Sequence, residues 1–123
     1  MRIQITGSRD FTDFSIVQSA IVRTIEDSGA ITYNSWVVHG GARGADTLAD
    51  RIAKRIGCEV EVFPANWNRY GKMAGHIRNV EMLDTDPDIV LAFFKRGAGN
   101  RGTQNLVNEA RRRGIPIKEY WEE

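Results

Sequence analysis

Short apolar runs alternate with amphipathic segments along the whole chain. Five runs rich in apolar and β-branched residues predict strands at Arg2–Thr6, Trp36–His39, Cys58–Phe63, Ile89–Phe94 and Ile115–Ile117. Between them, apolar residues recur every three or four positions and predict helices at Asp13–Ser28, Ala45–Ile56, Met73–Leu83 and around Leu106–Ala110. The pattern therefore alternates strand and helix from end to end.

This alternation predicts βαβ units and a parallel sheet with helices on both faces. We expect an α/β protein with a three-layer Rossmann-like fold, a single domain over residues 1–123. Its five-stranded, mainly parallel sheet should have the strand order 3-2-1-4-5. Ligands of such sheets bind beyond the carboxyl ends of the strands, where the strand order reverses, here between the first and fourth strands.

Several local features can be predicted in more detail. Thr12 is a candidate N-cap of the first helix, and residues 65–72 are expected to form a loop. In the third helix, the stripe formed by Ile77, Val80 and Leu83 should face the core. The residues after Ile117 are expected to form a polar tail.

Composition excludes several classes of protein. The 123 residues carry a formal net charge of +1, and the single cysteine excludes a disulfide framework and any multi-cysteine zinc site. The sequence contains no run of about 18 apolar residues, which a membrane-spanning helix would need. No signal peptide is evident either, so we expect a cytoplasmic protein. The two histidines lack partners at metal-ligand spacing, so we expect no metal and no cofactor.

The positions of the 12 glycines are more informative than their number. Gly29, Gly57 and Gly114 follow predicted helices and are expected to end them. The other nine fall after strands, in four groups: Gly7; Gly40, Gly41 and Gly44; Gly71 and Gly75; Gly97, Gly99 and Gly102. In a parallel sheet these loops open at the same edge, where backbone N–H groups ahead of helices can bind an anion.

The sequence His39–Asp46 (HGGARGAD) is the strongest candidate for a phosphate loop. It runs from a buried strand into a helix, and Arg43 could add a bidentate phosphate contact. The alternative is a tight turn that needs glycine. Asp46 either accepts a hydrogen bond from a ribose hydroxyl or is an acid of the kind favoured in a first helical turn. In the first loop, Ser8 and Arg9 suit phosphate or ribose contacts, although Arg9 could also be an ordinary surface arginine.

Two further segments could complete the site. The loop 95–103 offers a second phosphate cradle with Gly99, Gly102 and Thr103, although Thr103 could simply cap the helix that follows. A second stripe of the third helix carries Gly75, Arg78, Asn79 and Met82, and it either roofs the ligand or is a solvated face. Trp67 and Tyr70 could stack on a base or form oligomer contacts.

The chain resembles the SLOG superfamily, which includes the Smf/DprA DNA-processing proteins and the Lonely-guy enzymes. It is most similar to the small YspA/cpYpsA-related branch of bacteria and phages. The matching stretches are Thr6–Phe11, His39–Asp46, Phe63–Ala65 with Trp67, Gly75–Met82 and Gly102-Thr103. The resemblance implies a Rossmann-like fold and a site for nucleotides or nucleotide-derived ligands, often in oligomers.

Departures from the phosphoribohydrolase motif argue against its reaction. Arg78 matches that family's catalytic arginine, but Asn79 replaces a lysine, and Gly99–Thr103 lacks the proline of the glycine loop. Leu106 occupies the position of the catalytic glutamate. Without that carboxylate, the reaction should slow by orders of magnitude. Glu109, one turn later, is a poor substitute.

The expected function is therefore binding of a nucleotide or ADP-ribose-like molecule, as a sensor or sequestering module, by a homo-oligomer (dimer or tetramer). The predicted ligand-binding residues are Gly7, Ser8, Arg9, Gly40, Gly41, Arg43, Gly44, Asp46, Arg78, Asn79, Gly99, Gly102 and Thr103. The first alternative is N-glycosidic cleavage of a nucleoside 5′-monophosphate by Arg78 with Glu109 or Glu81. The second is binding of single-stranded DNA, against which the net charge argues.

Overall fold

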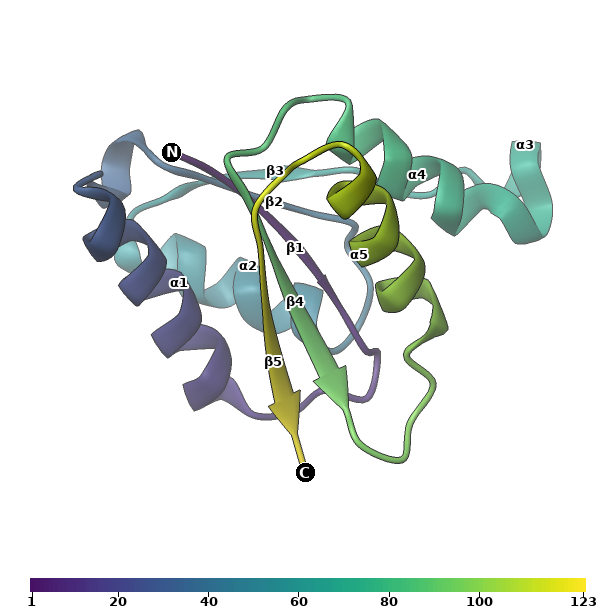
Figure 1. Ribbon diagram of the computed structural model, residues 1–123, viewed down its shortest axis with the longest axis horizontal. Coiled ribbons are helices and arrows are strands. Elements are labelled where there is room, and N and C mark those ends of the chain that lie inside the picture. Colours follow the sequence, from purple (N-terminus) through teal and green to yellow (C-terminus); the bar gives the residue numbers. More distant parts are fainter.

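A computed structural model describes all residues 1–123 (Figure 1). Its five strands are β1 (Arg2–Gly7), β2 (Trp36–His39), β3 (Glu59–Val62), β4 (Ile89–Lys95) and β5 (Ile117–Glu122). Its helices are α1 (Phe14–Ser28), α2 (Ala45–Ile56), α3 (Trp67–Tyr70), α4 (Ala74–Leu83) and α5 (Arg101–Arg112), with 3₁₀ turns η1 (Thr32–Asn34) and η2 (Gly71–Met73). None of these helices has the length and apolar character that crossing a bilayer requires.

The sheet confirms the predicted topology. The strands lie in the order β3-β2-β1-β4-β5, and every neighbouring pair is parallel. All five strands therefore end at the same edge of the sheet. The strand order reverses between β1 and β4, where Rossmann-like proteins bind ligands.

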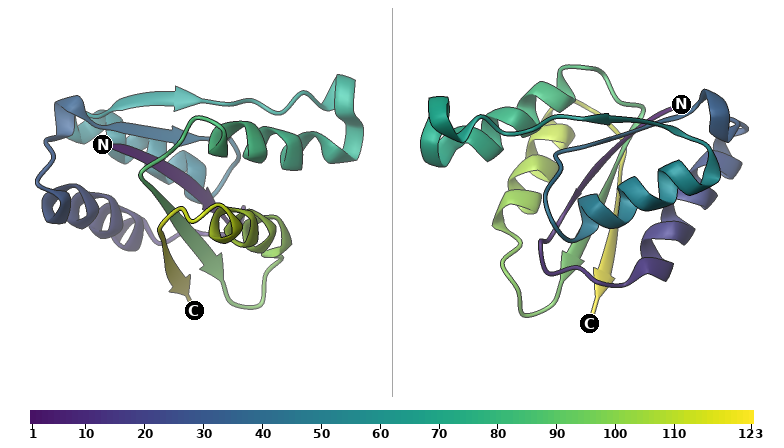
Figure 2. Two further views of the ribbon diagram at one scale, coloured as in Figure 1. Left: turned by 45° about the horizontal axis from the view of Figure 1, so that its top comes forward. Right: turned by 180° about the vertical axis from the view of Figure 1, so that it is seen from behind.

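Helices cover both faces of the sheet, so the fold has three layers (Figure 2). The larger core joins α1 and α2 to one face, and Phe93 of β4 lies at its centre, with its ring against Phe11. On the other face, Val90 packs against Leu83 of α4 and Leu106 of α5. Burying these side chains, at about 25 cal/mol per Å² of apolar surface, is the main force that holds the layers together.

Two candidate N-caps, Thr12 and Thr103, are wrong. Helix α1 is capped by Asp13, whose side chain accepts a hydrogen bond from the Ile16 N–H (3.1 Å), and not by Thr12. Thr12 instead donates to a distant carboxylate, which local sequence reasoning could not reveal. Helix α5 begins at Arg101, so Thr103 lies buried in its first turn and is not its N-cap.

The inward face of α4 also differs from the prediction. Leu83 is buried, but Ile77 and Val80 are only half-buried, whereas Met82 is almost fully buried. The helix is therefore rotated, and Met82 faces the body of the protein. The segment expected to be a loop before it contains the short helix α3 and the turn η2.

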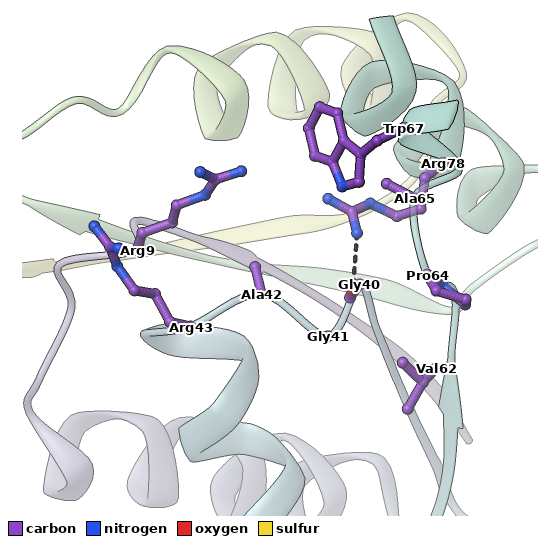
Figure 3. Close-up of a pocket in the computed structure, with 10 residues that line it drawn as sticks. All are labelled: Arg9, Gly40, Gly41, Ala42, Arg43, Val62, Pro64, Ala65, Trp67 and Arg78. Carbon is purple, nitrogen blue, oxygen red and sulfur yellow. Dashed lines mark hydrogen bonds between the residues drawn. The ribbon is translucent and has the colours of Figure 1, made fainter. Parts of the chain in front are cut away.

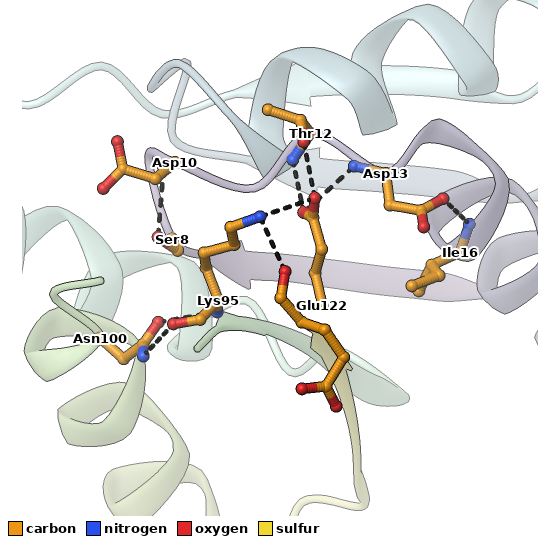
Figure 4. Close-up of polar contacts among 9 residues, drawn as sticks. Ser8, Asp10, Thr12, Asp13, Ile16, Lys95, Asn100 and Glu122 are labelled. Atoms are coloured by element: carbon orange, nitrogen blue, oxygen red, sulfur yellow. Dashed lines mark hydrogen bonds and ion pairs between the residues drawn. The ribbon is translucent and has the colours of Figure 1, made fainter. Parts of the chain in front are cut away.

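The end of the chain is a strand, not the predicted polar tail. Strand β5 pairs with β4 as far as Glu122, and the Glu122 carboxylate then binds two other segments (Figure 4). One oxygen accepts hydrogen bonds from the Thr12 and Asp13 N–H groups (2.7 and 3.2 Å). The other accepts from the Thr12 hydroxyl (2.6 Å) and from Lys95 Nζ (2.9 Å). This residue fixes the β1–α1 loop to the end of β4.

The predicted helix-ending glycines are confirmed. Gly29, Gly57 and Gly114 follow α1, α2 and α5, and each has a positive φ, between 73° and 92°.

Candidate functional site

A cleft lies over the carboxyl ends of β1, β2 and β3, beside the strand-order reversal. It consists of two cavities of about 410 and 180 Å³, which share Arg9, Ala42 and Arg78. The larger cavity is lined by Arg9, Gly40, Gly41, Ala42, Arg43, Val62, Pro64, Ala65, Trp67 and Arg78 (Figure 3). No carboxylate lines this cavity, although three arginines do.

Arg78 lies between the two cavities. Its Nη1 donates to the carbonyl oxygens of Gly40 (2.6 Å) and Phe63 (3.3 Å), and its Nε donates to Asn79 Oδ1 (2.9 Å). Burial lowers the pKa of Arg78, and the positive charge of Arg9 lowers it further, while Asp46 opposes both effects. Since a guanidinium stays charged in proteins, the cleft holds a cation that is short of counter-charge.

Arg9 and Arg43 lie on the opposite side of the larger cavity (Figure 3). Arg9 is exposed and has no ion-pair partner in the chain. Arg43 approaches Asp10 at 3.8 Å, but both side chains are more than half exposed, and such surface pairs are weak. Both guanidinium groups therefore remain available to an anion.

The other end of the larger cavity is apolar. Val62 is the last residue of β3, and Pro64 and Ala65 follow it. The Trp67 indole lies beside the Arg78 guanidinium (Figure 3). The outer edge of the Trp67 ring lies near Gly75, where a Cβ would stand 3.6 Å from the ring atom Cη2. Trp67 is 51% exposed, so a flat partner can reach its indole.

The loop 39–42 between β2 and α2 is held by two buried side chains. Asp46 accepts hydrogen bonds from the Gly40 and Ala42 N–H groups (3.1 and 3.2 Å). His39 Nδ1 accepts from the Gly41 N–H (2.9 Å), and its Nε2 lies 2.8 Å from Asp50 Oδ1. Since Nδ1 is an acceptor, His39 is the neutral tautomer that carries its proton on Nε2.

These contacts change the expected role of the loop. The N–H groups of Gly40, Gly41 and Ala42 are already used within the protein. Those of Arg43 and Gly44, at the start of α2, have no acceptor in the chain. The backbone donors left for an anion therefore lie at the helix end of the loop.

Asp46, in the first turn of α2, holds the backbone of the loop 39–42. Burial raises the pKa of its carboxyl group, while the positive charge of Arg78 and the two N–H donors act in the opposite direction. Its Oδ2 accepts both backbone bonds, and the residue also lines the smaller cavity.

At two positions between β2 and α2, neighbouring groups come so close to the backbone that a side chain would not fit. A Cβ at Gly40 would collide with the Arg78 guanidinium, so glycine lets Arg78 reach the loop backbone. Gly44 has φ +83°, and a Cβ there would collide with the backbone of Ser8 and Arg9. The β1–α1 and β2–α2 loops can therefore touch only because this residue is glycine.

The smaller cavity carries hydroxyl and amide side chains, which come from Thr6, Asn79, Thr103 and Asn105. The rest of its wall consists of the shared Arg9, Ala42 and Arg78 together with Ile5, Gly7, Asp46, Gly75, His76 and Gly102. Gly102 and Thr103 belong to the first turn of α5, whose N-cap residue Asn100 makes no side-chain cap bond.

Three of the predicted ligand-binding residues, Ser8, Gly44 and Gly99, lie outside both cavities, as do two arginines of the loop 95–103. Ser8 is buried, and its hydroxyl accepts a hydrogen bond from the Asp10 N–H (3.1 Å). Gly44 and Gly99 do not line the cleft either. Arg96 pairs with Glu123 (2.8 Å), and Arg101 also lies outside the cleft. The expected second phosphate cradle is thus reduced to Gly102 and Thr103.

The candidate catalytic carboxylates also lie outside the cleft. Leu106, at the position of the family's glutamate, is buried against Leu83 and Val90. Glu109 binds Arg112 and Arg113 (3.2 Å to Arg113 Nε), and these hydrogen bonds lower its pKa.

Sequence reasoning missed several lining residues. Val62 and Asn105 carry no local signal of a site, because a strand end or a helix turn can hold them for packing alone. Thr6 and His76 lie in stretches that match the family, but nothing in the sequence distinguishes them as lining residues. The Phe63–Ala65 stretch could have indicated the apolar wall, since it matches the family beside Trp67.

A parallel sheet with a cationic cleft at its strand-order reversal defines a Rossmann-like α/β protein with a site suited to an anionic ligand. Residues 1–70 match the family described as YAcAr, the YspA, cpYpsA-related SLOG family. The chain belongs to this family. Membership of the SLOG family suggests that the ligand of this chain is related to nucleotides.

A phage protein is similar over almost the full chain. The "Gene 61 protein" of Mycobacterium phage D29 is 41% identical over 122 residues, which cover 94% of this chain and 93% of that protein. Its name says nothing about a ligand. No solved structure matches the chain significantly.

Proposed function

We propose that this protein binds a phosphorylated, nucleotide-like small molecule in the cleft, as a sensor or sequestering module. The observation that carries the proposal is the larger cavity, in which Arg9, Arg43 and Arg78 meet with no lining carboxylate. Like charges brought together at a partly buried site repel one another. A bound phosphate group would relieve this repulsion and accept charge-assisted hydrogen bonds.

The two ends of the cavity give the ligand a direction. The phosphate would lie between Arg9 and Arg43, near the free N–H groups at the start of α2. A flat base would stack on the exposed Trp67 ring, beside the apolar side chains of Val62 and Pro64. The hydroxyl and amide groups of the smaller cavity would bind sugar hydroxyls.

The geometry favours binding over N-glycosidic cleavage. Among the lining residues of the two cavities, Asp46 is the sole carboxylate, and Gly40 and Ala42 already donate to it. Glu109 is held by Arg112 and Arg113, and Glu81 is exposed on α4 outside both cavities. Release of free base from nucleoside monophosphates by the purified protein would contradict this proposal and favour the enzyme alternative.

Calorimetric titration with adenosine, AMP, ADP and ADP-ribose tests the proposal, after native mass spectrometry of the purified protein for a retained nucleotide. We expect the phosphorylated compounds to bind and adenosine to bind at least ten-fold more weakly, since a charged hydrogen bond contributes about 1.5–3 kcal/mol. Arg43→Ala and Arg9→Ala should weaken binding, whereas Arg101→Ala, also exposed but outside the cleft, should not.

Other results would overturn the proposal. Equal affinity of the Arg43→Ala variant and the wild type would exclude the larger cavity as the phosphate site. Arg78→Ala should also abolish binding, but its contacts with Gly40 and Phe63 make it a test of loop structure as well. Tight binding of a single-stranded oligonucleotide that falls steeply with salt would favour the DNA-binding alternative.

A further inference from the structure

Strand β5 forms one edge of the sheet, and half of its backbone hydrogen-bonding groups point away from the protein (Figure 1). The ladder with β4 begins with a bond from the Val90 N–H to the Pro116 carbonyl oxygen (2.9 Å). Along a parallel ladder, alternate residues of a strand bond to the same neighbour. The even-numbered residues of β5 therefore bond to β4. The N–H and C=O groups that face outward belong to Ile117, Glu119 and Trp121.

This edge is long and regular. All six residues of β5 stand in continuous register with β4, without a bulge, and the strand contains no proline. Proteins usually shorten or interrupt a free edge, because its unpaired donors and acceptors are a template for another strand. At the opposite edge of the sheet, β3 has only four residues. Of the two edges, β5 is therefore the one suited to receive a further strand.

A groove of about 520 Å³ runs between this edge and α1, which we call the α1–β5 groove. It shares no lining residue with the cleft. Helix α1 contributes Ile16, Ser19 and Ala20 to its wall, and β5 contributes Tyr120, whose ring stacks on Phe93 with 5.3 Å between the ring centres. Because side chains alternate along a strand, every second side chain of a strand added to β5 would point into this groove.

The charges in the groove favour an acidic side chain. Arg23 and Lys118 both line it, and neither has an ion-pair partner in the chain. Two acids line it as well, but the Asp13 carboxylate is engaged as the cap of α1, where it accepts from the Ile16 N–H. Asp27 is then the single free carboxylate, against two free cations.

The other face of the edge is partly apolar. The Trp121 ring stacks on Phe94, with 4.6 Å between the ring centres, and the residue is still 44% exposed. Ile117 is half-buried on the same face of the strand. Aromatic side chains form favourable cross-strand pairs with β-branched residues. A strand beside β5 would therefore be most stable with β-branched apolar side chains on this face.

We propose that β5 is a docking site for an extended segment of another protein, which adds a sixth strand to the sheet. The segment alternates acidic residues, which point into the α1–β5 groove, with β-branched apolar residues, which lie beside Trp121. Backbone bonds to the outward groups of β5 supply affinity, and Arg23 and Lys118 select the acidic side chains. This docking does not depend on what the cleft binds.

Titration of the ¹⁵N-labelled protein with a capped heptapeptide of alternating valine and glutamate tests the proposal by NMR. We expect the amide signals of Glu119 and Trp121 to shift and that of Arg43, at the cleft, to stay in place. Two control peptides should bind at least about ten-fold more weakly. In one, lysine replaces glutamate. In the other, the backbone nitrogens are methylated and cannot donate. Equal binding of either control, or no shift at millimolar peptide, would overturn the proposal.

Substitutions in β5 separate its backbone from its side chains. Glu119→Pro removes one outward N–H and leaves the ladder with β4 intact, so it should weaken peptide binding at least about ten-fold. Glu119→Ala keeps the N–H and should bind like the wild type. Lys118→Glu changes an exposed side chain, so it should fold normally, and it should weaken binding of the glutamate peptide. It decides the matter if Glu119→Pro fails to fold. Unchanged affinity of Lys118→Glu would overturn the proposal, as would sedimentation showing a wild-type dimer that Glu119→Pro dissociates, since a second copy would then occupy the edge.

Discussion

The Glu122 carboxylate joins the end of the chain to the loop that carries Arg9, and its contribution to stability can be measured. Burial by itself would raise the pKa of Glu122, but the hydrogen bonds from Thr12, Asp13 and Lys95 outweigh it and lower the pKa from 4.5 to about 2. The side chain is only 13% exposed, so solvent screens these bonds little. The ionised form is therefore strongly favoured in the folded protein.

The size of the effect follows from this difference in pKa. A decrease of about 2.5 pKa units, at about 1.4 kcal/mol each, corresponds to an upper limit of about 3 kcal/mol. Because the folded-state pKa is the lower one, this stability is fully present above about pH 4.5. It is lost as the pH falls from about 4.5 toward 2. At pH 3, less than half of it should remain.

Urea denaturation of wild type and Glu122→Gln at a series of pH values measures this contribution. At pH 7, we expect the variant to lose about 2–3 kcal/mol, which corresponds to a fall in Tm of roughly 10 °C. The difference should shrink to about 1 kcal/mol near pH 3. Glu123→Gln is the matched control, because Glu123 is exposed and pairs only with Arg96 at the surface. A difference that stays constant between pH 7 and pH 3 would mean that the ionised Glu122 carboxylate does not stabilise the fold.

Three further substitutions test separate parts of the structure by the free energy of unfolding. Gly44→Ala should cost about 1–3 kcal/mol because of its positive φ and its contact with the first loop, whereas Gly99→Ala, in open space, should change stability little. Leu106→Glu should cost at least about 3 kcal/mol and bring no nucleotide hydrolysis, since the carboxylate would enter the core. Gln4→Leu should stabilise the protein by about 1 kcal/mol, because the buried Gln4 amide has no hydrogen-bond partner, and a destabilised variant would refute this.

Periodicity predicted the sheet because its signals are strong and local. The continuous apolar run of β4 is typical of a strand covered on both faces, and glycines such as Gly57 mark where helices end. The orientation of α4 could not be predicted in the same way. Its sequence carries apolar residues on two faces, and only tertiary packing determines that Met82 is buried while Ile77 is half-exposed.

The place of the cleft was predictable, but its internal contacts were not. Glycine loops that follow parallel strands must lie at one edge, so Gly40 and Arg43 were expected near Arg78. That His39 and Asp46 use the loop N–H groups depends on side-chain positions several residues away. Sequence alone therefore overestimated the number of free backbone donors in the loop.

In the proposed function, the arginines of the larger cavity bind a phosphorylated nucleotide-like ligand. Calorimetric titration of wild type, Arg43→Ala and Arg101→Ala with ADP-ribose measures whether they do. We expect the wild type and Arg101→Ala to bind, and Arg43→Ala, whose folding should be unchanged, to bind at least ten-fold more weakly. Equal affinities of the three proteins would contradict the proposed function.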